Sequence, residues 1–267
     1  MRRYSHLCRS FVVLAFGMAA AACHHSSSSI STATATADPE GIWMGTDQNG
    51  LSLTGFINAA GQSEFLRSDG TLFSGTLIIS EATLAGPLDG YAQIGTTFAD
   101  GTNFGLGTFG GTVVTRSSID ANWNFTTIDS MTTDNIWTLT YNSLYAKPSS
   151  LGSIAGSYTV SEPSGPSDGS TITISATGAI SGTNSATGCV LTGQVTVNYP
   201  TKDVYQIALS YASCTEAVLN GIPFTGLGIL DTTVTPAQVL IGVTGEAANQ
   251  TDPNKINFGL AMMLTAS

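Results

Sequence analysis

The chain has 267 residues, with 8 basic and 18 acidic side chains and a formal net charge of −10 at pH 7. A chain this acidic lacks the basic surface that nucleic-acid binding requires, so we exclude nucleic acid as a partner. Charged residues make up only 10% of the sequence, which leaves serine, threonine, asparagine and glutamine to cover most of the polar surface.

The first 22 residues have the pattern of a secretory signal peptide. Three arginines come first, and the apolar run 11–22 then leads directly to Cys23. This run is shorter than the roughly 20 residues that a membrane-spanning helix needs. We therefore expect residues 1–22 to be a signal peptide. The alternatives are a transmembrane anchor and an ordinary cleaved signal beside an incidental cysteine.

The residues before the cysteine, Ala20-Ala21-Ala22-Cys23, resemble the lipobox of bacterial lipoproteins, with alanine at position 20 where that motif usually has leucine. The resemblance implies that Cys23 is acylated, with chains such as palmitate, and that the lipid bilayer is a partner. Several acyl chains give stable anchoring, whereas a single chain is marginal. In this family a residue other than aspartate after the cysteine implies the outer membrane, and here that residue is His24.

Residues 23–39 are expected to form a flexible tether after the lipid. The stretch 24–37 holds serine, threonine and alanine with two histidines, one isoleucine and no acidic or basic side chain. Such a segment cannot bury enough apolar surface to fold. His24 and His25 have no third ligand nearby, so we predict no metal site in the tether.

From residue 40 onward the chain repeats itself, which indicates an internal duplication. We place the first repeat at 40–147 and the second at 152–267, with Pro148 as the breaker between them. Five short segments recur in the same order with nearly equal gaps: Gly41–Trp43 as Gly156–Tyr158, Ile57–Gly61 as Ile174–Gly178, Gly70–Gly75 as Gly188–Gly193, Phe104–Gly107 as Thr225–Gly228, and Ile136–Leu139 as Ile256–Gly259.

Both repeats have the sequence pattern of β-strands, with alternating stretches rich in threonine, valine, isoleucine and aromatic residues. The predicted strands include 51–58, 71–79, 91–98, 136–141, 170–175, 190–197, 204–211 and 239–243. Asp-Gly pairs predict turns, and they occur at Asp69-Gly70, Asp89-Gly90, Asp100-Gly101 and Asp168-Gly169.

The spacing of these turns predicts an all-β protein with two tandem repeats of about eight antiparallel strands each. Eight strands close a small up-and-down barrel, which is filled by side chains or holds one small ligand. Closure also removes the exposed sheet edges that promote aggregation. We therefore expect two small barrels. Two β-sandwiches are the alternative, and a single 16-stranded barrel is the third arrangement.

The chain has four cysteines, of which Cys8 leaves with the signal peptide and Cys23 takes the lipid. Cys189 and Cys214 remain, in an exported protein that meets an oxidising compartment.

The position of these two cysteines predicts that they form a disulfide. The expected strands 190–197 and 204–211 make a hairpin, in which opposite residues share a constant sum of residue numbers. A turn centred near 201–202 gives a sum near 403, which is the sum for Cys189 and Cys214. We therefore predict a structural disulfide between them at the open end of the hairpin.

Catalytic groups are scarce. The only histidines are His6, His24 and His25, so the expected folded region has none. Histidine-dependent nucleophilic catalysis and histidine-ligated zinc are thereby excluded there. The segment 105–110 fits the glycine pattern of a dinucleotide-binding loop but lies in a β context with no helix after it. We predict no enzyme activity, no catalytic residue, no cofactor and no metal.

Four aromatic residues are candidates for either the core or a ligand contact: Trp43, Trp123, Trp137 and Tyr158. Trp43 and Tyr158 occupy matching places in the two repeats, which favours core packing. Trp123 lies between Asn122 and Asn124, and this polar setting makes it the candidate for an exposed ligand contact.

The Gly-rich β region after the tether faintly resembles the barrel domains of transferrin-binding-protein-like surface lipoproteins. That resemblance implies architecture alone, because none of the family's binding residues can be aligned with this chain. We expect an envelope lipoprotein with a non-catalytic binding or surface-interaction role and an unidentified ligand or protein partner. The alternatives are a structural envelope component without a ligand and a carboxylate-based glycan hydrolase.

Overall fold

The computed structural model describes residues 36–161, 170–184, 188–247 and 257–267. The predicted signal peptide, Cys23 and nearly all of the predicted tether lie outside these residues, and so does the Asp168-Gly169 turn. Within the described part of the chain, no helix is long and apolar enough to span a membrane.

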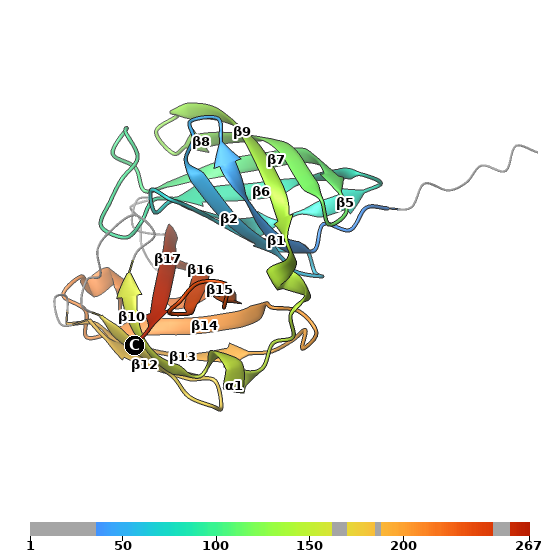
Figure 1. Cartoon of the computed structure of the whole chain (residues 1–267). Helices are drawn as coiled ribbons and strands as arrows, with labels where there is room; N and C mark the ends of the chain where they lie inside the picture. Colours follow the sequence, from blue (N-terminus) through green and yellow to red (C-terminus); the bar gives the residue numbers. More distant parts are fainter. Residues whose placement is uncertain (1–35, 162–169, 185–187, 248–256) are drawn as a thin grey trace, which may run out of the picture. The chain divides into compact units, whose positions relative to one another are not determined.

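The first repeat folds into a closed antiparallel barrel (Figure 1). The barrel closes because β1 pairs with β9 and β4 pairs with β6. The short β5 continues β4, since both strands pair with β6 in the same register. The strands are β1 (Gly41–Asp47), β2 (Ser52–Ile57), β3 (Gln62–Arg67), β4 (Leu72–Thr76), β5 (Ile78–Ser80), β6 (Thr83–Tyr91), β7 (Phe104–Val114), β8 (Ser118–Thr127) and β9 (Thr132–Asn142).

The second repeat forms a second closed barrel, in which every strand pairs with its neighbour in sequence and β17 pairs with β10. Two short helices, η1 (Ser143–Ala146) and α1 (Leu151–Ile154), connect the repeats. The strands are β10 (Gly156–Ser161), β11 (Thr171–Ile174), β12 (Ala179–Thr183), β13 (Val190–Thr196), β14 (Tyr205–Ala212), β15 (Pro223–Asp231), β16 (Gln238–Glu246) and β17 (Asn257–Ala266). The prediction of two eight-stranded barrels is therefore confirmed, and the sandwich and the single large barrel are wrong.

The repeated sequence segments fall on corresponding strands of the two barrels. Gly41–Trp43 begins β1, as Gly156–Tyr158 begins β10, and the other four pairs match in the same way along the strand order. The turn glycines Gly61 and Gly178 both have positive φ, of 77° and 83°, a conformation that glycine adopts without strain. The repeats thus share turn chemistry as well as strand order.

Aromatic rings fill the interior of the first barrel. Trp43, Trp137, Phe65 and Phe73 are completely buried there. Ring centroids of Phe65 and Phe73 lie 5.2 and 5.0 Å from that of Trp137, the spacing of favourable aromatic pairs. The interior of the second barrel is mostly aliphatic and contains no tryptophan.

One end of the second barrel is closed by the segment that enters it. Ile154 of α1 is completely buried in the barrel core. Tyr158 donates a hydrogen bond from its hydroxyl to the carbonyl of Ile154 at 2.6 Å, and Tyr205 donates to the carbonyl of Ser150 at 3.5 Å. We call this the closed end.

A third apolar cluster lies outside the two barrel interiors, within the compact unit that extends from residue 35 to the end of the chain. It includes Phe56 and Leu72 of the first repeat, Tyr145 of the connection, and Leu227 and Ala261 of the second repeat. The connecting segment is thus part of an apolar core, in contrast to a flexible linker.

Two local predictions are wrong. Residues 91–98 do not form a strand, because β6 ends at Tyr91 and a loop follows. The Asp89-Gly90 pair lies inside β6, where a turn was predicted. The reason is packing: a Cβ on Gly90 would lie 2.7 Å from the Phe125 ring, so this glycine makes room for an aromatic side chain.

Candidate functional site

Successive strands of the second barrel end alternately at its two ends. Strands β11, β13 and β15 end at the closed end with α1, whereas β10, β12, β14 and β16 end at the opposite end. We call the latter the open end. The candidate site lies in the barrel interior at this end.

The site is a cavity of about 290 Å³. Most of the described side chains that line it are apolar, and none of these carries a charge. The exposed residues Thr171 and Thr183 belong to the lining, so the cavity reaches the surface. The lining residues are Ile94, Val160, Ser170, Thr171, Ile172, Thr183, Asn184, Cys189, Leu191, Tyr211, Leu219, Leu260 and Met262.

The cavity exists because aliphatic side chains occupy the interior where the first barrel has indole rings. The inward-facing residues of β9 include Trp137 and Leu139, whereas the corresponding strand β17 presents Leu260 and Met262 to the cavity. A barrel of eight strands has a fixed interior width, and smaller side chains leave part of it empty.

Two polar side chains lie next to each other on the inner face of the rim. Thr171 and Thr183 are paired across β11 and β12, and the same register places Ser170 opposite Asn184. Ile172 is buried two residues along from Ser170, so alternation turns Ser170 inward as well. Ser170 is buried and Asn184 is half-buried. A hydroxyl and a carboxamide therefore form the polar part of the lining.

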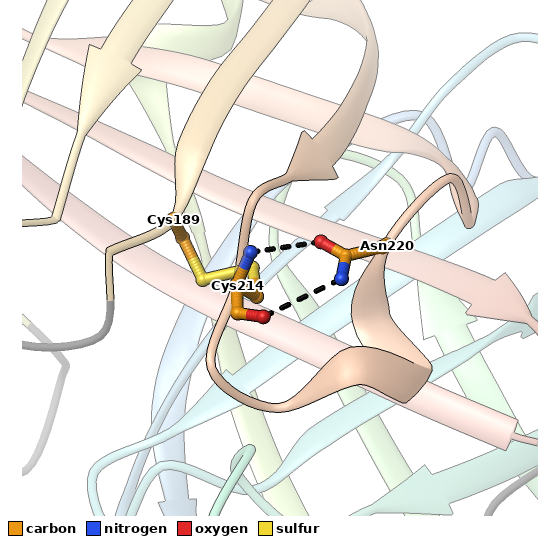
Figure 2. The surroundings of a disulfide bond; sticks show 3 residues. All are labelled: Cys189, Cys214 and Asn220. Carbon is orange, nitrogen blue, oxygen red and sulfur yellow. Dashed lines mark hydrogen bonds between the residues drawn. A yellow bond between two sulfur atoms is a disulfide. The ribbon is translucent and has the colours of Figure 1, made fainter.

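The disulfide between Cys189 and Cys214 continues the rim next to Asn184, whose backbone N–H donates to the Cys189 carbonyl at 2.8 Å. Figure 2 shows this disulfide. Asn220 reaches the backbone of Cys214 twice: its Oδ1 accepts from the Cys214 N–H at 2.8 Å, and its Nδ2 donates to the Cys214 carbonyl at 3.4 Å. Leu219, the last residue of the short helix η2 (Ala217–Leu219), is next to Asn220 and lines the cavity. The disulfide and Asn220 together fix this apolar side chain at the rim.

The predicted disulfide is confirmed, with one refinement of the register. The β13–β14 ladder pairs Val190 with Ala212, a sum one lower than the sum for the two cysteines. Ser213 has a φ of +59°, and this left-handed residue adds one position to the second strand before Cys214. Leu191 and Tyr211, which line the cavity, form the next inward pair of the same ladder.

The expectation that Trp123 is exposed is wrong. Its side chain is 2% exposed and points into the first barrel, where Nε1 donates to the Leu88 carbonyl at 2.8 Å. The flanking residues Asn122 and Asn124 face outward, as the strict alternation of burial along β8 requires. The polar neighbours that suggested exposure lie on the outer face of the strand, whereas Trp123 lies on its inner face.

Four carboxylic side chains are buried among the described residues, and none of them lines the cavity: Asp47, Glu64, Asp203 and Asp231. Burial raises the pKa of Glu64 well above its ordinary value, although Oε1 accepts a hydrogen bond from Ser74 at 3.1 Å. Burial also raises the pKa of Asp203 to about 7, and its Oδ1 accepts from the Leu230 N–H at 3.2 Å. Among the described residues, no group of three or more histidine, cysteine, aspartate or glutamate side chains is arranged to hold a metal ion.

The sequence reasoning did not find the cavity, although a signal for it was present. All three tryptophans lie in the first repeat, at Trp43, Trp123 and Trp137. The two barrels have the same number of strands, but their inward-facing side chains differ in total volume. The barrel without tryptophan is therefore the one that contains the cavity.

Comparison with models of known protein families finds no match, and comparison with curated protein sequences finds none either. Among solved structures, the chain is similar to a protein of Bacteroides fragilis NCTC 9343 that is provisionally described as an outer membrane protein. The identity is 14% and the TM-score 0.25, over 85% of this chain and 96% of the other. A TM-score this low carries no argument about fold or function.

Proposed function

We propose that the chain is a lipid-anchored envelope protein whose second barrel binds a small apolar molecule without chemical conversion. The observation that carries this proposal is the cavity of about 290 Å³ at the open end of the second barrel. The anchor rests on the lipobox-like segment that ends at Cys23, which also supports an outer-membrane location.

The size and lining of the cavity fit a small ligand. The volume is close to the lower limit of about 300 Å³ that is usual for ligand pockets. It is roughly twice the 150 Å³ of an engineered apolar cavity that binds benzene. Each Å² of apolar surface that a ligand buries there contributes roughly 25 cal/mol. Leu191, Leu260 and Met262 supply such surface.

A binding role also accounts for the difference between the two barrels. The first barrel has a filled aromatic interior, which suits a structural role, and the second keeps space at one end. A purely structural envelope component is the competing proposal. It predicts that the cavity stays without a ligand when the protein is isolated from its host.

Native mass spectrometry on the Cys23→Ser protein, released from its own host's envelope and kept free of detergent, tests the proposal. We expect a reproducible added mass of one small molecule per chain. A bare chain mass in repeated preparations would contradict ligand binding and favour the structural role.

Two neighbouring methionines offer a matched pair of variants. Met262 lines the cavity, whereas Met263 follows it on the strand and faces the other side of the barrel wall. Met262→Trp should fill the cavity and abolish the added mass, and Met263→Trp adds the same volume on the outer face and should retain it. Loss of the added mass in both variants would show that the ligand is bound elsewhere.

A further inference from the structure

We infer that the cavity selects an uncharged amphiphile, with its polar group held by Ser170 and Asn184 and its apolar body packed against Leu191, Leu260 and Met262. This inference rests on the proposed function and adds the chemical class of the ligand.

The absence of charge follows from the lining. Among the residues that the structure describes, no lysine, arginine, aspartate, glutamate or histidine lines the cavity. An ionised carboxylate or ammonium group that loses its water there finds no opposite charge among these lining residues, and such unpaired burial costs several kcal/mol. A neutral ligand avoids this cost.

Besides the uncharged lining, the negative net charge of the protein disfavours the binding of anionic ligands. Three of the 8 basic residues precede Cys23, whereas all 18 acidic residues follow it, so the chain from Cys23 onward carries −13. The field of this charge repels anionic ligands before they reach the cavity, most strongly at low ionic strength.

The polar end of the ligand follows from the position of Ser170 and Asn184. They lie side by side at the rim, beyond the last paired residues of β11 and β12. A serine hydroxyl donates one hydrogen bond and accepts others, and an asparagine carboxamide offers two donors and an acceptor. They can serve a ligand hydroxyl or amide alongside their existing partners.

The apolar end follows from strands on either side of the polar pair. Leu260 and Met262 project inward from β17, and Leu191 projects inward from β13. Leu191 lies opposite Gly182, two residues farther from the open end than Asn184, so the apolar body of a ligand held at Asn184 extends into the barrel towards Leu191. The cavity volume, about twice that which holds a benzene ring, corresponds to a ligand of roughly a dozen non-hydrogen atoms.

Three ligands that differ only in the head group test the inference: 1-decanol, decanoate and decylammonium. Calorimetric titration of the Cys23→Ser protein at pH 8 should give a Kd for decanol at least about tenfold lower than for either ion, since unpaired burial of charge is costly. The affinity for decanoate should rise as the pH falls towards 5, because the neutral acid becomes available, while that for decanol stays constant. Equal affinity of the alcohol and the two ions would overturn the inference and leave the proposed function standing.

The role of the polar pair has its own control. Asn184→Leu should weaken decanol binding by about 2- to 10-fold, the usual effect of one lost hydrogen bond. Ser181→Ala removes an outward-facing hydroxyl from the same strand and should leave the affinity unchanged. An unchanged affinity in Asn184→Leu would overturn the assignment of the polar end. Failure of all three ligands to bind a chain that carries a native added mass would overturn the ligand class alone, whereas failure together with a bare native mass would overturn the proposed function itself.

Discussion

Aromatic residues with a polar atom perform the same task in both repeats. Trp43 donates from Nε1 to the carbonyl of Pro39 at 3.0 Å, and Tyr158 donates from its hydroxyl to the carbonyl of Ile154 at 2.6 Å. In each case the acceptor precedes the aromatic residue by four positions. Both rings are buried and tie the segment that enters the barrel to the barrel core. The expectation that these matching aromatics belong to the core is therefore confirmed.

Two indole rings in the first barrel differ in one hydrogen bond and therefore form a matched pair. Trp123 donates to the Leu88 carbonyl, whereas the buried Nε1 of Trp137 has no partner among the described residues. Trp123→Phe removes volume and leaves a buried carbonyl unpaired, which should cost about 2–3 kcal/mol of unfolding free energy.

Trp137→Phe removes a similar volume but no hydrogen bond, so we expect it to cost about 1 kcal/mol less. Urea denaturation of both variants measures the difference. Trp123→Phe should also retain the ligand of the second barrel. Equal costs would contradict the role of the Trp123–Leu88 bond.

Asp203 predicts a pH dependence of stability. Burial raises its pKa to about 7 and Asp231 acts in the same direction, while Lys147 acts against them. The unfolded carboxyl releases its proton near pH 4, so between about pH 4 and 7 the folded chain binds more protons than the unfolded chain. The free energy of unfolding therefore falls as the pH rises through this range.

The variant Asp203→Asn keeps the shape of the side chain without the ionisable group. Its unfolding free energy should fall less steeply than that of the wild type between pH 4 and 7, as measured by urea denaturation at several pH values. A residual slope is expected from Glu64, whose pKa is raised for the same reason. A slope identical to that of the wild type would contradict the burial of a neutral Asp203.

At the scale of elements, the β13–β14 hairpin and the loop after it form the rim of the cavity. The ladder brings Leu191 and Tyr211 together in the lining, the disulfide joins the strand ends beside them, and Asn220 holds the following turn. The two cysteines at matched positions can be recognised in the sequence. The role of Leu219 at the rim, which this arrangement fixes, cannot.

The double variant Cys189→Ser/Cys214→Ser should lower the unfolding free energy by roughly 3 kcal/mol, because the disulfide closes a loop of 25 residues in the unfolded chain. Urea denaturation without reductant measures this loss. A reductant added to the wild-type protein should lower its stability by a similar amount. Thiol labelling of the denatured, unreduced wild-type protein should find neither cysteine free, and labelling of both would refute the disulfide.

At the scale of the whole molecule, two barrels of the same strand number differ in their interiors: aromatic rings pack in the first, and the second keeps the cavity that is the proposed binding site. The predicted anchor joins them to a bilayer through Cys23. Cys23→Ser should move the protein from the membrane fraction to the soluble fraction, because no other acylation site is predicted.

Cys8→Ser serves as the control for the anchor, since that cysteine lies in the predicted signal peptide and the variant should stay with the membrane. Fractionation at high salt followed by detection of the chain measures both variants. Retention of Cys23→Ser in the membrane fraction at high salt would refute the lipid anchor.

The sequence by itself determined the class of the fold, the number of strands in each repeat and the disulfide. These features depend on alternation, turn residues and the arithmetic of an antiparallel hairpin, all of which are local or nearly local. Predictions from local sequence pattern were wrong where contacts or faces of the folded barrel decided the conformation or burial of a residue. Gly90 lies in a strand because Phe125 packs on it, and polar neighbours on the outer face concealed the burial of Trp123.

The cavity was decided only by the tertiary structure. Its volume is the part of the barrel interior that side chains from eight separate segments leave empty, and no single stretch of sequence determines it. Strand register likewise decides that Ser170 and Asn184 lie next to each other. The position of Leu219 depends on the disulfide and on Asn220. The fold therefore followed from the sequence pattern, whereas the proposed binding site follows from how the barrel closes around residues that are far apart in the chain.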